Sequence, residues 1–315
     1  MKIRRGLVLL MIALGMAACA EAPAPPPPDE PAEPKSSPTK PPKPITAGAA
    51  PTKEQQTTTA QDTLGGTSAS NGQTGVFDYR VEKPSSPTYE SYYLSVAFSA
   101  PVIRGLELFN ATLSFPTDLP VYVKECEMTN AFYYPSEHMI VICYEMIHAF
   151  HTSYSALGST LTEAEKLDVT SKATAFIALH EAGHAFIGEN HLAVLGKEED
   201  AVDDISAVMF IVNKDFDVPW HGTRALINVA PGASAFADEH SFSAQRYFSA
   251  LCLIYGSDPV GFAPYVGSQD DWLLPPERAQ RCPSEWQTKQ AALKQLTAPF
   301  VRKTPAPMKG VAFGG

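Results

Sequence analysis

The sequence has too few basic residues for a protein that binds polyanions. It has 315 residues, with 24 Lys and Arg against 34 Asp and Glu, and a formal net charge of −10. An acidic chain repels a phosphate backbone and has no cationic stripe for an anionic membrane surface, so nucleic acid is not expected as a partner. The chain has no CxxC spacing, which argues against a four-cysteine metal site. It also has no apolar run of the ~20 residues that a transmembrane helix needs.

Aromatic residues are missing from the first quarter of the chain. None occurs before Phe77, and twelve prolines fall between residues 22 and 51. Such a segment cannot bury enough apolar surface to offset the entropy lost on ordering. We therefore interpret residues 20–75 as a disordered tether rich in Pro, Gly and Ser. Residues 76–305 are then one folded domain, and residues 306–315 a flexible tail.

The N-terminus has the pattern of an export signal. Basic residues at positions 2, 4 and 5 precede an apolar run from Leu7 to Met16, which two alanines connect to Cys19. Residues 1–19 thus resemble a lipoprotein signal peptide, with Cys19 as the site of lipidation. Met16 stands where such signals usually have Leu, and a plain secretory signal is the alternative. We expect an exported protein that is lipid-anchored in the bacterial cell envelope, facing the periplasm or the surface. Ala20, in place of Asp, favours the outer membrane.

Four further cysteines follow the tether: Cys126, Cys143, Cys252 and Cys282. An even number of cysteines in an exported protein predicts two disulfides, because compartments outside the cytoplasm are oxidising. Three connectivities are possible, and we favour the sequence-local one, Cys126–Cys143 and Cys252–Cys282. Each bridge would stabilise the fold by about 3 kcal/mol through loss of unfolded-chain entropy.

Hydrophobic periodicity gives a coarse view of the fold. Two extended stretches, Pro120–Val123 and Met139–Ile142, predict an antiparallel hairpin. Apolar residues at helical spacing predict a long helix from Thr162, with Gly188 and Asn190 marking its end. Together these elements indicate an α+β fold with a small antiparallel sheet. Further helices are expected over Ala201–Val212, from about Ser241 to Tyr255 after a loop rich in Gly and Pro, and from Gln287 to Leu296.

One motif carries metal chemistry. His180-Glu181-Ala182-Gly183-His184 is an HExxH segment on the predicted long helix. Because residues four apart share a helix face, both imidazoles can reach one Zn²⁺ at about 2.0–2.1 Å. Glu181 then lies beside the water that zinc activates and can act as general base. A buried helix with two hydrogen-bonded histidines and a purely structural zinc site are the competing interpretations.

A catalytic zinc site needs a third protein ligand. His191 is eleven residues after His180, which is ~16 Å along a continuous helix, and one residue later than in the metzincin pattern. The acidic run after it offers a better candidate, because Glu199 and Asp203 are four apart on one side of a second helix. There Glu199 can bind zinc while Asp203 accepts a hydrogen bond from a ligand imidazole. Glu198, which projects onto the apolar face of that helix, is the rival third ligand.

The run HEAGHAFI followed by GKEEDAVDD resembles a family of bacterial exported metallopeptidases known mainly as a domain of unknown function. It is also similar to the gluzincin pattern, HExxH followed by ExxxD. The resemblance implies a zincin-like fold, with zinc on His180, His184 and Glu199 and with Glu181 as the base. It implies no particular substrate. It covers most of residues 90–300, including Asn130–Tyr133, Cys143–Glu145, the helix start with Gln245 and Arg246, Cys252–Gly256 and Cys282.

A peptidase also needs a group that stabilises the oxyanion. His240 and Tyr247, from a separate helix, are the candidates, although His240 can instead cap or pack at that helix start. The stretch Ala131–Tyr134 is a candidate edge strand along which a substrate peptide can lie by β-augmentation. Ordinary sheet structure is the alternative for this stretch.

These residues together predict a zinc-dependent endopeptidase of the cell envelope. Its partners would be a peptide or protein substrate and, through the lipid on Cys19, a membrane. The alternative from another class is a lipoprotein that keeps the scaffold without turnover and acts as a binding or assembly factor. Glu181 separates the two, because water activation requires it and zinc binding does not. Zinc-dependent hydrolysis of a non-peptide bond is a third interpretation.

Overall fold

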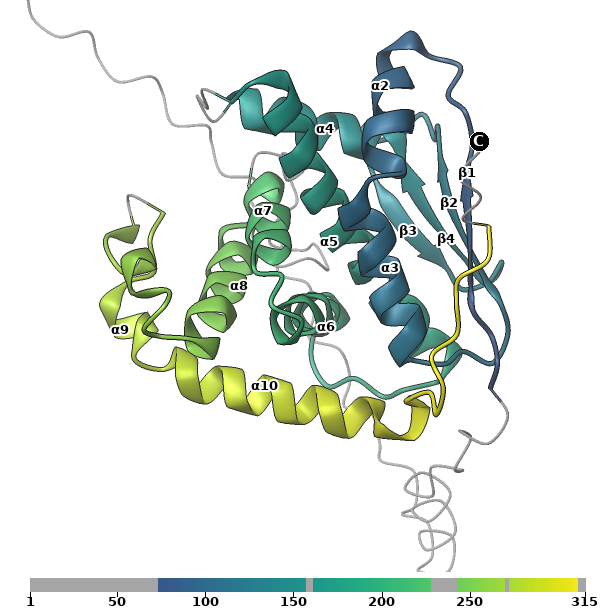
Figure 1. Cartoon of the computed structure of the whole chain (residues 1–315). Coiled ribbons are helices and arrows are strands. Elements are labelled where there is room, and N and C mark those ends of the chain that lie inside the picture. Colours follow the sequence, from purple (N-terminus) through teal and green to yellow (C-terminus); the bar gives the residue numbers. More distant parts are fainter. Residues whose placement is uncertain (1–72, 157–160, 228–242, 270–271, 311–315) are drawn as a thin grey trace, which may run out of the picture. The chain divides into compact units, whose positions relative to one another are not determined.

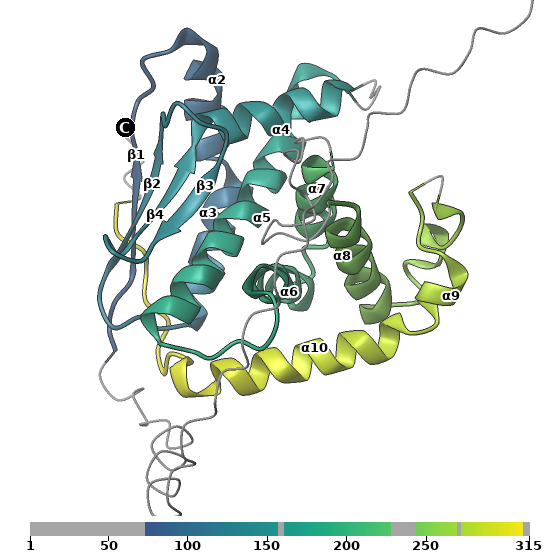
Figure 2. The same cartoon turned by 180° about the vertical axis from the view of Figure 1, so that it is seen from behind.

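A four-stranded sheet and a layer of helices make up the part of the chain that the computed structural model describes, residues 73–156, 161–227, 243–269 and 272–310 (Figures 1 and 2). The predicted α+β class is confirmed. The predicted signal peptide, Cys19, His240 and nearly all of the tether lie outside the described residues. The strands are β1 (Phe77–Val81), β2 (Leu119–Lys124), β3 (Ala131–Tyr134) and β4 (Met139–Cys143), in the order β1-β2-β4-β3.

The sheet is mixed, so the prediction of a small antiparallel sheet is wrong. β2 and β4, which the sequence suggested as a hairpin, lie parallel, with Val121 beside Ile140 and Val123 beside Ile142. The hairpin is formed instead by β3 and β4, which pair antiparallel across the turn at residues 135–138. β2 and β4 are the two central strands of the sheet. The chain between them is long enough to form the edge strand β3 before β4 begins.

One face of the sheet packs against helices, as Figure 1 shows for α3 (Ala100–Thr112). Residues of β2 alternate between buried and half-buried, as a strand with one covered face requires. Phe77 on β1 has its ring centroid 5.9 Å from that of Phe109 on α3. Lys309, in the stretch that the sequence assigns to the tail, pairs with the outer edge of β1. Within the described residues β3 pairs only with β4, so β3 is the open edge of the sheet.

The long helix α5 (Glu163–Glu189) is the central element of the helical layer. It begins with a capping box between Thr162 and Glu165. From Val169 to Ile187 nearly every side chain on it is buried, whichever way the side chain points. A helix whose side chains are buried on every face lies inside the core. Among the described residues, no helix is long and apolar enough to cross a membrane. α5 contacts β3, β4, α3, α4 (Tyr144–Ala156), α6 (Glu198–Val212) and α7 (Asp217–Leu226).

Helix α7 was not predicted, because the sequence from residue 213 was interpreted as a loop. The stretch predicted as a loop rich in Gly and Pro includes Pro219 and Gly222, and both suit a helix here. Pro219 lies in the first turn, where its missing N–H would have no helical partner. Gly222 faces Phe176 on α5, and a Cβ at position 222 would lie only 2.3 Å from the Cβ of Phe176. The glycine thus allows α7 to approach α5 closely.

Two disulfides each join a pair of elements in the described part of the chain. Cys126–Cys143 connects the ends of the parallel strands β2 and β4, and Cys252–Cys282 connects α8 (Ser243–Ser257) to α10 (Cys282–Thr297). This is the sequence-local connectivity. α10 is longer than the predicted closing helix, because Pro283 is tolerated in its first turn. A chain with two bridges of this kind belongs in an oxidising compartment.

Removing the α8–α10 bridge with Cys252→Ala and Cys282→Ala should lower the free energy of unfolding by about 3–4 kcal/mol, because the bridge closes a loop of 30 residues in the unfolded chain. Urea denaturation of the wild type and the double variant, both with Cys126–Cys143 intact, measures the difference. Equal stability under non-reducing conditions would mean that the bridge does not form in the protein.

Candidate metal centre

Three side chains with metal-binding atoms meet where α5 passes α6. Ring nitrogens of His180 and His184 and a carboxylate oxygen of Glu199 lie within 4.8 Å of one another. The Nε2 atoms of His180 and His184 are 3.1 and 3.2 Å from the two Glu199 oxygens. Ligand atoms around a tetrahedral Zn²⁺ with bonds of about 2.0–2.1 Å are roughly 3.3 Å apart. The donor set and its spacing therefore suit a metal ion.

The second nitrogen of each imidazole faces a carboxylate. His180 Nδ1 is 2.8 Å from Asp203 Oδ1, and His184 Nδ1 is 2.7 Å from Glu198 Oε1. Such contacts fix the ring orientation and leave Nε2 for a metal. Asp203 thus contacts a histidine as the i,i+4 spacing from Glu199 predicts. Glu198, the rival third ligand, lies on the Nδ1 side of His184, because one helical residue turns it about 100° away from Glu199.

The surrounding acids change the proton affinity of the histidines. Burial alone would lower the pKa of His184, but hydrogen bonds to Glu199 and Glu198 raise this pKa to about 9. The pKa of His180 is also raised, because its hydrogen bonds to Asp203 and Glu199 outweigh the opposing effect of burial. A metal ion would have to displace these protons, so metal affinity should fall as the pH falls.

Arg246 is not among the site residues predicted from the sequence, although it stands at the helix start that shares the family resemblance. On α8 its guanidinium binds Asp203 in a bidentate pair, Nε to Oδ2 at 2.6 Å and Nη2 to Oδ1 at 2.7 Å. Burial alone would raise the pKa of Asp203, but the charge of Arg246 and the hydrogen bonds hold it well below its usual range. The signal in the sequence was a single arginine at the start of a helix that is otherwise largely apolar.

A glycine sets the distance between the two helices of the cluster. A Cβ on Gly183, between the two histidines, would lie 3.0 Å from Cβ and Cγ1 of Val202 on α6. Without that Cβ, α6 can approach α5 closely enough for Glu199, one turn before Val202, to reach both imidazoles. The positive end of the helix dipole also stabilises the carboxylates in the first turn of α6.

Glu181 is buried beside this cluster and is not one of its three donors. Burial is the main cause that raises the pKa of its carboxyl group, while the backbone N–H of Tyr133 on β3 donates a hydrogen bond to it. The Tyr133 hydroxyl donates to Glu189 Oε1 at 2.7 Å, and His138 Nδ1 lies 2.7 Å from the same oxygen. The edge strand is therefore attached to the end of α5, one turn after His184.

A cavity of about 610 Å³ exposes these groups to a ligand. One wall is strand β3 and the residues just before and after it, from Asn130 to Pro135. The three metal-binding side chains, Glu181 and Arg246 also line the cavity. The predicted edge strand thus lies along the same cavity as the HExxH residues.

Two other predicted site residues lie elsewhere. His191 is at the end of α5 with φ of 51°, in the turn that terminates the helix, and is not among the clustered metal-binding side chains. The Tyr247 hydroxyl donates to the carbonyl oxygen of Trp272 at 2.9 Å. Tyr247 belongs to a separate apolar cluster and does not line the cavity of the histidines.

Enlarging residue 183 should weaken metal binding. Gly183→Ala adds a Cβ that presses on Val202 and moves Glu199 away from the imidazoles, so the zinc dissociation constant should rise about tenfold or more, as for loss of a supporting group. Zinc titration against a competing chelator measures this. The double variant Gly183→Ala, Val202→Gly should recover zinc affinity, although glycine within α6 costs about 1 kcal/mol of stability. If Gly183→Ala binds zinc as tightly as the wild type, helix spacing does not determine the site.

Comparison with known proteins supports the metal chemistry of this cluster. The family described as "Putative metallopeptidase" (DUF4344) matches residues 99–297. The match contains the HExxH segment, the acidic start of α6 and Arg246. No curated protein and no solved structure matches the chain. Because the match spans more than half of its 315 residues, the chain belongs to the DUF4344 family.

Proposed function

We propose that the chain is a zinc-dependent endopeptidase with a zincin-like catalytic domain. Three side chains with zinc-binding atoms and the buried carboxylate of Glu181 meet in one open cavity, and this observation carries the proposal. His180, His184 and Glu199 hold the ion, because two imidazoles and one carboxylate are a ligand set of catalytic zinc sites. Asp203 and Glu198 orient the two imidazoles through Nδ1.

Zinc at these ligands supplies a Lewis acid that makes water nucleophilic at neutral pH and polarises a carbonyl group. Glu181 then accepts the proton of the attacking water and delivers it to the nitrogen of the leaving amine. Its position suits this role, because Glu181 is buried at the same cavity. Among the described residues, no arginine or lysine donates a hydrogen bond to its carboxylate. His180, His184 and Glu199 remain in place through the reaction.

The open edge of β3 supports a peptide as the substrate. On this edge the N–H of Ala131 donates to Asn130 Oδ1 and that of Tyr133 donates to Glu181. An extended peptide that adds as a further strand beside the cavity would therefore pair with the carbonyl groups of β3 that face away from β4. A peptide bound in this way passes Glu181 and the metal ligands. Main-chain hydrogen bonds of this kind recognise any extended peptide and leave sequence preference to the side chains of the cavity wall.

The place of action that we propose is the cell envelope. The two disulfides support an oxidising compartment. The N-terminal pattern supports lipidation at Cys19, and the proline-rich tether over residues 20–75 would hold the catalytic domain away from the membrane. Substrates would then be peptides or proteins that reach the same envelope face.

The variant Glu181→Gln tests the enzyme against a scaffold without turnover. It keeps the size of the side chain and removes the proton acceptor, so hydrolysis of a broad peptide library should fall by a factor of about 10²–10⁴. Zinc content and thermal stability should stay near the wild-type values. The matched control is Glu107→Gln, which changes an exposed glutamate on α3. If the wild type and Glu181→Gln are equally inactive on every peptide, a binding or assembly role replaces the proposed function.

A second set of variants tests the ligand assignment. Glu199→Ala removes a donor and should nearly abolish tight zinc binding, whereas Glu198→Ala and Asp203→Ala should weaken it by about 10–100-fold, because they only orient imidazoles. His191→Ala should leave zinc affinity unchanged. Zinc dissociation constants from chelator competition measure all four. Unchanged affinity in Glu199→Ala, with loss in Glu198→Ala or His191→Ala, would assign the third ligand to another residue.

A further inference from the structure

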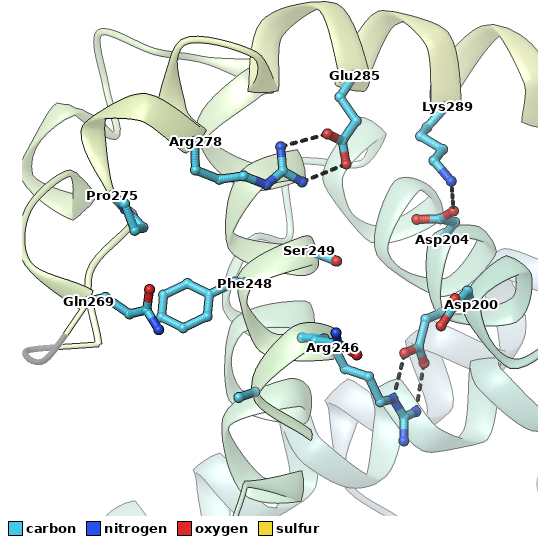
Figure 3. A pocket seen from close by; sticks show the side chains of 13 residues that line it. Asp200, Asp204, Arg246, Phe248, Ser249, Gln269, Pro275, Arg278, Glu285 and Lys289 are labelled. Atoms are coloured by element: carbon cyan, nitrogen blue, oxygen red, sulfur yellow. Dashed lines mark hydrogen bonds and ion pairs between the residues drawn. The ribbon is translucent and has the colours of Figure 1, made fainter. Parts of the chain in front are cut away.

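Arg246 lies between two cavities. On one side it lines the cavity of the HExxH residues. On the other it lines a charged cavity of about 570 Å³ formed by residues of α6, α8, α10, α9 (Pro276–Ala279) and the loop before α9 (Figure 3). Other charges of this second cavity are also paired: Arg278 with Glu285 and Lys289 with Asp204. The pair between Arg246 and Asp203 differs from these two pairs, because Asp203 also contacts His180, a candidate zinc ligand.

The contact is built so that one carboxylate oxygen serves two partners. Asp203 Oδ1 lies 2.7 Å from Arg246 Nη2 and 2.8 Å from His180 Nδ1. Asp203 Oδ2 is held by Arg246 Nε at 2.6 Å, and Arg246 Nη2 also lies 3.5 Å from His180 Nδ1. The planar guanidinium thus fixes both oxygens, and with them the direction in which Oδ1 meets the imidazole. Arg246 and the Asp203 side chain are 9% and 14% exposed, so water competes little for these bonds.

We propose that Arg246 is a positioning residue of the metal centre. Its positive charge compensates that of Asp203 inside the protein and holds this carboxylate against His180. Asp203 then accepts the hydrogen bond of a proton on His180 Nδ1, so that Nε2 faces the metal. A buried carboxylate without its cation would turn towards water or another donor. His180 would then lose the bond that sets its tautomer and ring orientation. The inference rests on the proposed zinc site, but it concerns metal affinity and does not require peptidase activity.

The geometry also predicts that lysine cannot replace Arg246. The ammonium group of lysine is a single point of charge. It cannot stand at the positions of Nε and Nη2 at the same time, so it cannot bind both Asp203 oxygens as the guanidinium does. The helix that carries the arginine is itself fixed, because α8 is bridged to α10 by Cys252–Cys282. A free guanidinium ion, by contrast, has the right shape and charge. In Arg246→Ala it can reach Asp203 through the adjoining charged cavity.

The test is zinc affinity of the purified protein, measured by titration against a competing chelator. Arg246→Ala should raise the zinc dissociation constant by about 10–100-fold, as expected for loss of a group that orients a ligand. Guanidinium chloride at tens of millimolar should restore much of the affinity, and the same concentration of sodium chloride should not. Arg246→Lys should stay within the weakened range. Arg278→Ala is the matched control, because it removes a bidentate pair from the same cavity and should leave zinc affinity unchanged.

A double-variant cycle shows whether Arg246 acts through Asp203. If it does, Arg246→Ala should weaken zinc binding little further in a protein that already carries Asp203→Ala. Additive losses, or an Arg246→Ala protein with wild-type zinc affinity, would overturn the proposal while leaving the peptidase function standing. If Arg246→Ala does not fold, Arg246→Lys in the same cycle gives the answer. A wild type that binds zinc but cleaves no peptide would contradict the proposed function alone, and one that binds no zinc would overturn both.

Discussion

The candidate site depends on the close crossing of α5 and α6 at Gly183. The absence of a side chain there allows Val202 to pack directly on the helix that carries the HExxH segment. That contact brings the first turn of α6 up to the two imidazoles, so that Glu199 faces both Nε2 atoms. The rest of the site follows from this arrangement, because residues at fixed helical intervals on α6 then meet fixed positions on α5.

The balance of charge explains why a cation suits this place. In the described part of the chain, the carboxylates of Glu181, Glu198, Glu199 and Asp203 surround the two imidazoles, and Arg246 is the buried guanidinium among them. Buried charges need partners, since leaving water costs each several kcal/mol. In the metal-free protein the histidines offset the excess of negative charge by binding protons, as the pKa of about 9 for His184 indicates. A divalent ion would offset it without protons and would leave Glu181 available at the cavity.

The sequence was most informative where the chemistry is local. The i,i+4 spacing of His180 and His184 and the four-residue interval from Glu199 to Asp203 follow from helix geometry alone, and the structure brings these four residues together. Strand pairing was not predictable in this way, because β2 and β4 are both apolar and their direction depends on the chain between them. Helix α7 was missed since Gly222 signals a loop until its contact with Phe176 is known.

The position of bound zinc tests the central claim most directly. Crystals of the domain grown with zinc, with anomalous diffraction measured on both sides of the zinc absorption edge, would locate the ion without reference to activity. We predict one strong site, about 2.0–2.2 Å from Nε2 of His180, Nε2 of His184 and a carboxylate oxygen of Glu199. A zinc ion bound elsewhere, or ligated here by Glu198 or His191 in place of Glu199, would contradict the account.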